Sequence, residues 1–258
     1  MNKENQAKII ELVKQAKPLI LQEMAHEKVT EKGVADYVTN VDVAVQNYLK
    51  EALGKEFPDI ALIAEEKENL GLNSRKSYWI LDPIDGTTNL IRDYHLSAVS
   101  LGLYENGEIT FGVVYNPFTE ELFYGAKGEG AYLNGTPIHV SDQPEFKDAV
   151  VSFGSSPYEK NRAKELFPVF YNIFMNCADF RRTGSAALDL CYVACGRQHA
   201  YLEQNLKPWD YSGATVILRE AGGTITDWEN KEPPYLENSD ILACVPQFRE
   251  ILQHLIKK

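Results

Sequence analysis

One segment, residues 79–90, constrains the fold of this chain more than any other. It begins with the apolar run Trp-Ile-Leu at 79–81, which predicts a buried β-strand. The run leads directly into two aspartates, Asp82 and Asp85, with a proline between them. Because the proline ring fixes its own φ and offers no N–H group, the turn after the strand has few alternative conformations. The segment therefore predicts a strand end that holds two carboxylates in a fixed arrangement.

The chemistry of this segment suits a divalent metal and a phosphate group. Carboxylates are hard oxygen donors, and Mg²⁺ prefers carboxylate, carbonyl and water ligands. Gly-Thr-Thr-Asn follows at residues 86–89 and predicts the start of a helix, whose first N–H groups can bind phosphate. Metal and phosphate ligands this close together are typical of metal-dependent phosphoryl transfer. The alternative is a capped turn between strand and helix, since Asp, Pro and Gly are all common turn residues.

Two more acidic positions lie at the ends of predicted elements. Residues 60–64 form a second apolar strand candidate, which Glu65 and Glu66 follow. Asp210 comes at the start of an apolar helix predicted over residues 211–221. Each position has a simpler interpretation by itself, because Asp210 could be a helix N-cap and the two glutamates a solvated strand end. Taken with the aspartates of residues 79–90, they predict an acidic cluster that folding assembles.

Length and composition are those of an ordinary globular protein. The 258 residues, 44% hydrophobic and 24% charged, suffice for one large or two closely associated domains. A formal net charge of −11 argues against nucleic acid or an anionic membrane as a default partner. We recognise no export signal and no apolar run near the roughly 20 residues that span a bilayer, so we expect a cytoplasmic protein. Its four cysteines are expected to be reduced thiols, and Cys191 and Cys195 are expected to be small core residues rather than a zinc site.

The first part of the chain predicts helices followed by an antiparallel meander. Residues 7–24 have a helical period that Pro18 should kink or split. Residues 39–42 have the form of a capping box, before a helix that ends near Gly54. Residues 96–140 alternate between apolar and polar positions and carry turn sequences, which is typical of antiparallel strands.

After about residue 145 the pattern changes to an alternation of strands and helices. The expected strands are 149–153, 200–203 and 223–226, and the expected helices are near 158–174, 185–195, from 210 and 246–256. We therefore predict an α+β half over residues 1–145 and an α/β half over residues 146–258. The halves should pack as layers and share a cleft, where ligands commonly bind.

The chain resembles the inositol monophosphatase family of Mg²⁺-dependent, lithium-sensitive sugar phosphatases. The resemblance covers residues 36–245 and rests on motifs in the expected order: Ala-Glu-Glu at 64–66, Trp-Ile-Leu-Asp-Pro-Ile-Asp-Gly-Thr-Thr-Asn at 79–89, Gly-Val-Val-Tyr at 112–115, Gly-Glu-Gly-Ala-Tyr-Leu-Asn-Gly at 128–135, Trp-Asp-Tyr-Ser-Gly-Ala at 209–214 and Glu-Ala-Gly-Gly at 220–223. It implies a layered αβαβα fold, which is α/β in class, and a homodimer.

The resemblance also implies an activity. The expected enzyme is a phosphomonoesterase that hydrolyses myo-inositol monophosphate or related sugar monophosphates by direct attack of a metal-bound water. Thr88 and Asn89 favour this branch over relatives that act on phosphoadenosine phosphates. Fructose 1,6-bisphosphate and the 2′-phosphate of NADP(H) remain alternative substrates. A regulatory, protein-binding member of the family is the alternative from a different functional class.

Individual roles follow from the matched positions. Two or three Mg²⁺ ions would be bound by the side chains of Glu65, Asp82, Asp85 and Asp210 and the carbonyl of Ile84. Thr87 would orient the water with the help of Asp42, although Asp42 also fits the capping box. Glu66 would support a neighbouring ligand or bind a weaker metal. Where the family often has a lysine beside the third metal, the aligned residue is Glu31, with Lys32 next to it.

The same resemblance implies contacts with a small phosphorylated polyol or sugar. Glu203 would bind a hydroxyl of the alcohol portion, or be a solvated strand end instead. The full set of expected substrate contacts is Asp85, Gly86, Thr87, Thr88, Gly184, Ser185, Ala186, Glu203 and Asp210.

Overall fold

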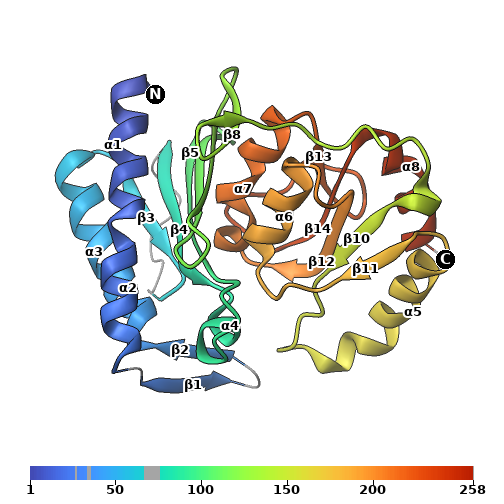
Figure 1. The fold of residues 1–258 in the computed structure, drawn as a ribbon, viewed down its shortest axis with the longest axis horizontal. Helices are drawn as coiled ribbons and strands as arrows, with labels where there is room; N and C mark the ends of the chain where they lie inside the picture. Colours follow the sequence, from blue (N-terminus) through green and yellow to red (C-terminus); the bar gives the residue numbers. More distant parts are fainter. Residues whose placement is uncertain (27, 34–35, 67–75, 258) are drawn as a thin grey trace.

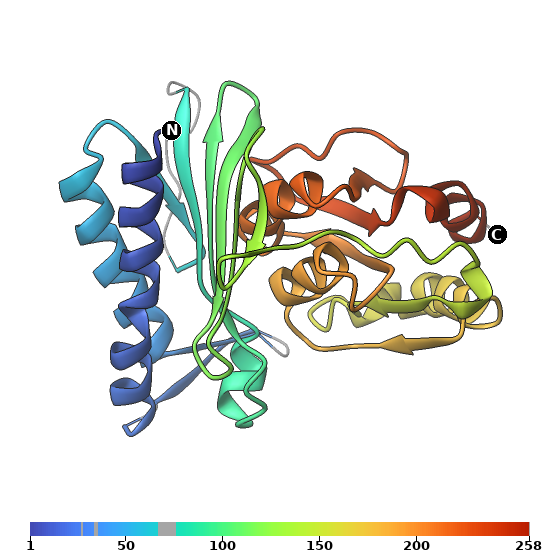
Figure 2. The same cartoon turned by 45° about the horizontal axis from the view of Figure 1, so that its top comes forward.

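The structure is a computed structural model that describes residues 1–26, 28–33, 36–66 and 76–257. Five layers alternate between helices and sheets (Figures 1 and 2). From one side to the other they are helices α1 (Lys3–Lys14), α2 (Ala16–Met24) and α3 (Asn40–Glu56), a large sheet, helices α6 (Ala186–Ala194) and α7 (Pro208–Glu220), a smaller sheet, and helices α5 (Ala163–Phe174) and α8 (Arg249–Ile256). This arrangement confirms the expected αβαβα layering.

The large sheet has seven strands in the order β3-β4-β5-β6-β7-β8-β9. Their bounds are β3 (Ala61–Ala64), β4 (Ser77–Asp85), β5 (Ala98–Glu105), β6 (Glu108–Asn116), β7 (Glu121–Ala126), β8 (Gly130–Leu133) and β9 (Thr136–Pro137). The strands from β4 onward pair antiparallel, and β3 pairs parallel with β4. The meander predicted over residues 96–140 is therefore confirmed.

Strand β4 is buried on both faces of this sheet. Tyr78 and Ile80 belong to the core shared with α6 and α7, whereas Trp79 and Leu81 belong to the core beneath α1, α2 and α3. Successive side chains of a strand point to opposite faces, so Asp82 continues the alternation on the side of α6 and α7. The register with β5 is interrupted between Asp82 and Asp85. The sequence of β4 thus directs its terminal carboxylates toward the centre of the molecule.

The smaller sheet has the order β11-β10-β12-β14-β13, with β10 (Val150–Phe153), β11 (Asp179–Arg181), β12 (Ala200–Leu206), β13 (Thr224–Asp227) and β14 (Ser239–Cys244). The three strands expected in this part are confirmed, but β11 and β14 were not predicted. A hairpin of β1 (Val29–Gly33) and β2 (Asp36–Thr39) was also missed, because every residue of β1 is exposed and offers no apolar alternation. The last strand of the larger sheet ends at Pro137 and the first of the smaller begins at Val150. The division near residue 145 stays a prediction, since the sheets do not show whether either half folds alone.

The remaining helical elements are α4 (Thr87–Ile91) and the 3₁₀ turns Phe146–Asp148, Lys160–Arg162 and Pro246–Phe248. The helix predicted over residues 7–24 is split at Gln15, between α1 and α2. Pro18 explains the position of the break, because it cannot donate to the carbonyl of Lys14 one turn earlier. The four cysteines are free thiols. Among the described residues, no helix combines the length and apolarity that crossing a membrane requires.

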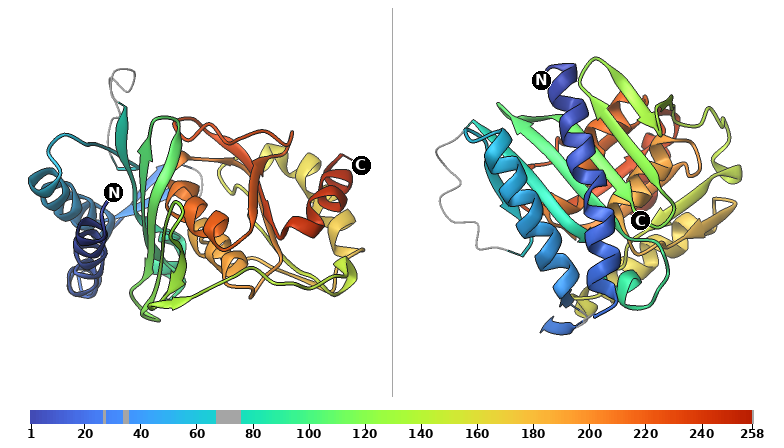
Figure 3. Two further views of the ribbon diagram at one scale, coloured as in Figure 1. Left: turned by 90° about the horizontal axis from the view of Figure 1, so that it is seen from above. Right: turned by 60° about the vertical axis from the view of Figure 1, so that its left-hand side comes forward.

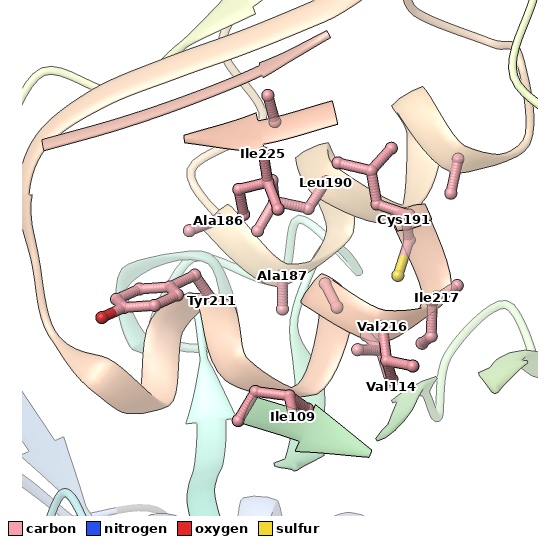
Figure 4. Close-up of a cluster of buried hydrophobic side chains, with 14 of the residues drawn as sticks. Ile109, Val114, Ala186, Ala187, Leu190, Cys191, Tyr211, Val216, Ile217 and Ile225 are labelled. Carbon is pink, nitrogen blue, oxygen red and sulfur yellow. The ribbon is translucent and has the colours of Figure 1, made fainter. Parts of the chain in front are cut away.

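Helix α7 lies directly against one face of the large sheet (Figure 3). At three glycines the backbones of the helix and the sheet are in contact. A methyl group at Gly112 of β6 would lie 2.0 Å from the carbonyl oxygen of Gly213 in α7, and one at Gly102 of β5 would lie 3.0 Å from Ser212. Apolar side chains of α6, α7, β6 and β13 form one buried cluster in this region, in which Val114 of β6 lies against Val216 of α7 (Figure 4). The three glycines therefore set how near α7 approaches β4.

We predict that Gly112→Ala destabilises the protein and Gly54→Ala does not. The added methyl group at residue 112 meets a backbone oxygen that cannot rotate away, so the free energy of unfolding should fall by about 3 kcal/mol. Gly54 lies in α3 with no other atom within 4 Å of the added methyl group, so alanine there should add about 0.5–1 kcal/mol. Urea denaturation of both variants measures the difference. Equal stabilities would show that the helix can move away from the sheet at little cost.

Candidate active site

Three aspartates distant in sequence meet between the large sheet and α7. Asp82 and Asp85 come from the end of β4, and Asp210 comes from the first turn of α7. One carboxylate oxygen from each lies within 4.8 Å of those from the other two. Asp82 and Asp85 are buried, with exposed fractions of 2% and 7%. Such a group of hard oxygen donors fits a Mg²⁺ ion.

The electrostatics of the cluster favour a bound cation. Burial, together with the charges of Glu65, Asp85 and Asp210, raises the pKa of Asp82 well above its ordinary value. Burial also raises the pKa of Asp85 to about 6, and burial and Asp85 raise the pKa of Asp210 well above its ordinary value. Burial is the main cause in all three cases, and for Asp82 and Asp210 the neighbouring carboxylates also oppose ionisation. A divalent cation would remove this repulsion. A cluster that served only the stability of the fold would not bring these carboxylates together.

Hydrogen bonds fix the orientation of these carboxylates. Asp82 Oδ1 accepts from the backbone N–H of Ile84 at 3.0 Å. Asp85 Oδ2 accepts from the hydroxyl of Ser185 and from the backbone N–H of Ala187 at 2.8 Å, both at the start of α6. Ser185 is the N-cap of α6 and is buried. Its side chain is thus bonded to Asp85, and only its backbone would be available to a substrate.

Thr87 and Asp42 are in direct contact. Thr87 Oγ1 lies 3.0 Å from Asp42 Oδ1 and 3.1 Å from the carbonyl oxygen of Ile84. The other oxygen of Asp42 accepts from the backbone N–H of Thr39 at 2.9 Å and from its hydroxyl at 2.6 Å. The two interpretations of Asp42 therefore hold together. It completes the capping box of α3 with one oxygen and contacts Thr87 with the other.

Asp210 has the same position in its own helix. It is the third residue of α7, and its Oδ2 accepts from the backbone N–H of Lys207 at 2.7 Å. The N-cap of α7 is Lys207, so the alternative that Asp210 is an N-cap residue is wrong. The bond to Lys207 orients the Asp210 carboxylate, which also belongs to the cluster with Asp82 and Asp85.

Glu65 and Glu66 share a lysine. Lys32 Nζ lies 3.1 Å from Glu65 Oε1 and 2.7 Å from Glu66 Oε1. The residue that brings a positive charge to this pair is therefore Lys32, whereas Glu31 is exposed on β1. Burial raises the pKa of Glu65 to about 7, against the opposing charge of Lys32. Among the described residues, the group of oxygens within 4.8 Å contains the three aspartates without Glu65.

Gln46 of α3, which sequence analysis did not select, holds the backbone of Glu66. Its Nε2 donates to the carbonyl oxygen of Glu66 at 2.9 Å, and its Oε1 accepts from the N–H of Glu66 at 3.0 Å. The residue is buried, and its helical position gives no sign of this role. It fixes the end of β3 relative to α3, which also carries Asp42.

Gly86 joins β4 to α4 in a conformation that favours glycine. Its φ is +89°, and a methyl group there would lie 3.0 Å from the carbonyl oxygen of Leu96. Helix α4 begins at Thr87, with Thr88 exposed beside it. The first N–H groups of a helix have no partner within it, so Gly86 and the two threonines offer donors for an anion. These are the donors expected from the sequence.

Asn89 connects this turn to the second half of the chain. Its Nδ2 donates to the carbonyl oxygens of Leu96 at 2.7 Å and of Thr183 at 2.9 Å. Gly184 follows with a φ of +86° and packs against the Asn89 side chain. Asn89 is part of the motif at residues 79–89, yet sequence analysis gave it no role. The expected contact residues at 86–88 and 184–186 are thereby brought together.

Glu203 lies at the second sheet and is not a solvated strand end. Its Oε1 accepts from the N–H of Ser156 at 2.9 Å, and its Oε2 accepts from the hydroxyl of Tyr201 at 2.5 Å. A methyl group at Gly154 would lie 1.8 Å from its carboxyl carbon, so the side chain occupies the space that glycine leaves. Burial raises the pKa of Glu203. Sequence analysis missed both partners: Ser156 is 47 residues away from Glu203 in the chain, and nothing in the sequence of β12 marks Tyr201 as a donor.

Comparison with known proteins identifies the family. The model of the inositol monophosphatase family matches residues 1–258. The chain belongs to this family. Its curated relatives include the Nus factor SuhB of Vibrio cholerae, which is 37% identical over 227 residues, 88% of this chain and 85% of that protein.

Solved structures share the whole fold. The inositol monophosphatase from Anabaena (Nostoc) sp. PCC 7120 superposes with a TM-score of 0.87 at 32% identity, over 99% of this chain and 96% of that one. An IMPase/NADP phosphatase complexed with Mg²⁺ and phosphate superposes with a TM-score of 0.90 at 25% identity, over 98% and 95% of the two chains. The chain is thus similar both to proteins named as phosphatases and to a protein named as a Nus factor.

We predict that Asp82→Asn stabilises the metal-free protein and abolishes its stabilisation by Mg²⁺. A carboxyl whose pKa is raised by folding opposes folding at pH 7, because the unfolded chain ionises more easily. Asparagine removes the charge and keeps an oxygen for Ile84. The melting temperature in EDTA should rise by at least about 2 °C, the shift expected for ~1 kcal/mol in a chain of this size. Asp59→Asn, the same change at an exposed turn, should alter neither measurement. A normal Mg²⁺ shift in Asp82→Asn would place the metal elsewhere.

Proposed function

We propose that this protein is a Mg²⁺-dependent phosphomonoesterase that hydrolyses myo-inositol monophosphate or a related sugar monophosphate. The observation that carries the proposal is the convergence of Asp82, Asp85 and Asp210 beside the Thr87–Asp42 pair. Glu65 and the Ile84 carbonyl complete the set of groups that would hold two or three Mg²⁺ ions. Bound there, the ions would neutralise phosphate charge and lower the pKa of a water molecule. Phosphoryl transfer depends mainly on such charge neutralisation and on positioning.

Thr87 and Asp42 would orient the attacking water. Asp42 Oδ1 accepts a hydrogen bond from the Thr87 hydroxyl, so the lone pairs of Thr87 Oγ1 are left to accept a hydrogen bond from water. Both residues are held by helix starts, Asp42 in α3 and Thr87 in α4. The water would attack phosphorus directly, and the phosphoester bond to the alcohol would break as the new P–O bond forms. Glu66, bonded to Lys32 and Gln46, would support Glu65 from outside the cluster.

The two ends of the substrate would contact different parts of the chain. The N–H groups of Gly86 and Thr87 and the Thr88 side chain would bind the phosphate, next to Asp85 and Asp210. Gly184, Ser185 and Ala186 would contact the polyol through their backbone, since the Ser185 side chain is bonded to Asp85. Glu203 would accept a hydrogen bond from a hydroxyl group, because a carboxylate offers about four lone-pair sites, more than the donors of Ser156 and Tyr201 occupy.

The alternatives to this proposal are of two kinds, a different substrate and a regulatory role. NADP(H) 2′-phosphate is a candidate substrate because the IMPase/NADP phosphatase shares this fold, and fructose 1,6-bisphosphate is another sugar phosphate that such a site could accept. A regulatory role through protein partners is the alternative that the SuhB relatives support. The intact acidic cluster favours catalysis, because a binding protein gains nothing from buried carboxylates that repel one another. The net charge of −11 disfavours direct nucleic-acid binding.

We also propose a homodimer in the cytoplasm. Exposed apolar side chains gather on α5 and the neighbouring edge strand β11, where Phe174 packs against Phe180: they are Phe167, Tyr171, Phe174, Met175 and Phe180. Asp179 and Arg181 flank Phe180. If β11 pairs antiparallel with β11 of a second copy, Asp179 of each copy lies opposite Arg181 of the other. Such self-complementary pairing is what a two-fold symmetric interface requires. A single-chain mass by light scattering at micromolar concentration would contradict the dimer.

We predict that a panel of phosphate esters will show turnover that depends strictly on a hard divalent cation. Inositol monophosphate, fructose 1,6-bisphosphate, NADP⁺ and p-nitrophenyl phosphate are each assayed for released phosphate in Mg²⁺, in EDTA and after Mg²⁺ is restored. Asp85→Asn should reduce kcat by at least about 10²–10³-fold, because a charge that stabilises the transition state is lost. Turnover in EDTA would contradict the metal mechanism. No turnover of any ester in Mg²⁺ would favour the regulatory alternative.

We predict that Glu203→Gln acts unequally on different substrates. Glutamine keeps an oxygen for Ser156, and its amide can donate to the hydroxyl of Tyr201, so the fold should be retained. A hydrogen bond between a charged group and a hydroxyl contributes roughly 1.5–3 kcal/mol, or about ten- to a hundredfold in kcat/KM. Inositol phosphate should lose most of this factor, whereas p-nitrophenyl phosphate, which has no hydroxyl to donate, should lose little. Equal losses would assign Glu203 a structural role.

A further inference from the structure

A buried carboxylate in α6 lies outside the set of residues that the proposed mechanism uses. Asp189 is 2% exposed. Its Oδ2 accepts from the hydroxyl of Thr183 at 2.7 Å, and its Oδ1 accepts from Gln198 Nε2 at 3.2 Å. A buried carboxylate is costly unless donors satisfy it, so these contacts specify a particular arrangement of the chain around it.

Thr183 transmits this arrangement to the start of α6. Its Oγ1 accepts from the backbone N–H of Ser185 at 3.1 Å. Its carbonyl oxygen accepts from Asn89 of the first half of the chain at 2.9 Å. Thr183 is thus held from the second half by Asp189 and from the first half by Asn89. The chain between Thr183 and Ser185 contains Gly184 in the left-handed region, where the direction of the backbone changes.

The two groups that follow this turn are those that hold Asp85. The Ser185 hydroxyl and the Ala187 N–H both donate to Asp85 Oδ2, and the Ser185 hydroxyl also caps α6 by accepting from Leu188 N–H at 3.3 Å. A shift of the turn would move both donors together. One oxygen of Asp85 would then be free to rotate away from the position in which it joins Asp82 and Asp210.

We propose that Asp189 and Thr183 are positioning residues that fix the Asp85 carboxylate for metal binding through the Ser185 turn. The proposal rests on the metal site of the proposed function. It predicts that the Thr183 hydroxyl, two hydrogen bonds away from Asp85, influences the affinity for Mg²⁺ although it contacts neither metal nor substrate. Groups that orient metal ligands in this way commonly change metal affinity or activity by 10–100-fold when removed.

The test compares removal of two threonine hydroxyls. Thr183→Val removes the hydroxyl that joins Asp189 to Ser185. Thr215→Val removes a buried hydroxyl of α7 that donates to the carbonyl oxygen of Tyr211 at 2.9 Å, and it serves as the matched control. Calorimetry with Mg²⁺ alone measures the dissociation constant, and hydrolysis of p-nitrophenyl phosphate measures kcat and its Mg²⁺ dependence. Thr183→Val should weaken Mg²⁺ binding about tenfold. Thr183→Ser should restore it, and Thr215→Val should leave it unchanged.

A double-mutant cycle shows whether Thr183 acts through Ser185. If it does, the loss of Mg²⁺ affinity in the double variant Thr183→Val/Ser185→Ala should be clearly smaller than the sum of the two single losses, because Ser185→Ala already removes one of the two donors that Thr183 positions. Additive losses, or equal losses in Thr183→Val and Thr215→Val, would overturn the proposal. If the wild type binds Mg²⁺ but hydrolyses no ester, the proposed function fails while the calorimetric comparison still decides this inference. A wild type that does not bind Mg²⁺ would overturn both.

Discussion

The contact between α7 and the large sheet is the interaction on which the rest of the site depends. Gly213 of α7 approaches Gly112 of β6 so closely that no side chain fits between the two backbones. Helix α7 begins five residues before Gly213, and its first turn carries Asp210. The closeness of the contact therefore decides whether Asp210 reaches the aspartates at the end of β4. A larger residue at either glycine would separate Asp210 from Asp82 and Asp85 as well as loosen the core, which links the stability of this protein to the geometry of its proposed metal site.

The N-terminal turns of three helices fix the orientation of the carboxylates that converge on the site. Asp42 and Asp210 are both the third residue of a helix, and each gives one oxygen to the backbone N–H that precedes the helix. A carboxylate at such a position is stabilised by the helix dipole and by the donor that it satisfies. Asp85 has the reverse relation, since the start of α6 provides donors for a carboxylate from another element. In each case a helix terminus that needs a partner anyway also fixes the direction of an acid.

Much of this arrangement was predictable from local sequence. The apolar run at 79–81 predicts β4, because a strand that is buried on both faces needs an unbroken apolar run. The aspartates that follow the run mark the end of the strand and indicate a site for a metal ion. The capping box at Asp42 was visible for the same reason, since its residues are three apart. The hairpin of β1 and β2 was not, because its first strand is exposed along its whole length and pairs only with its neighbour. Lys32 lies on that hairpin, so its contact with Glu65 and Glu66 could not be foreseen, and Glu31 was selected from alignment alone.

Most of the contacts that sequence analysis missed join segments distant in the chain. Asn89 bonds to Thr183, and Ser156 bonds to Glu203, across gaps that no periodicity records. The contact of Asn89 with Thr183, like those of Asp85 with Ser185 and Ala187, joins the two halves of the protein beside Asp85, a residue proposed to bind metal. The cluster of like charges opposes folding in the absence of a cation, and the contacts between the halves hold it together in spite of that repulsion. The proposed metal ion would then neutralise a site that is already formed, because folding itself brings the carboxylates together.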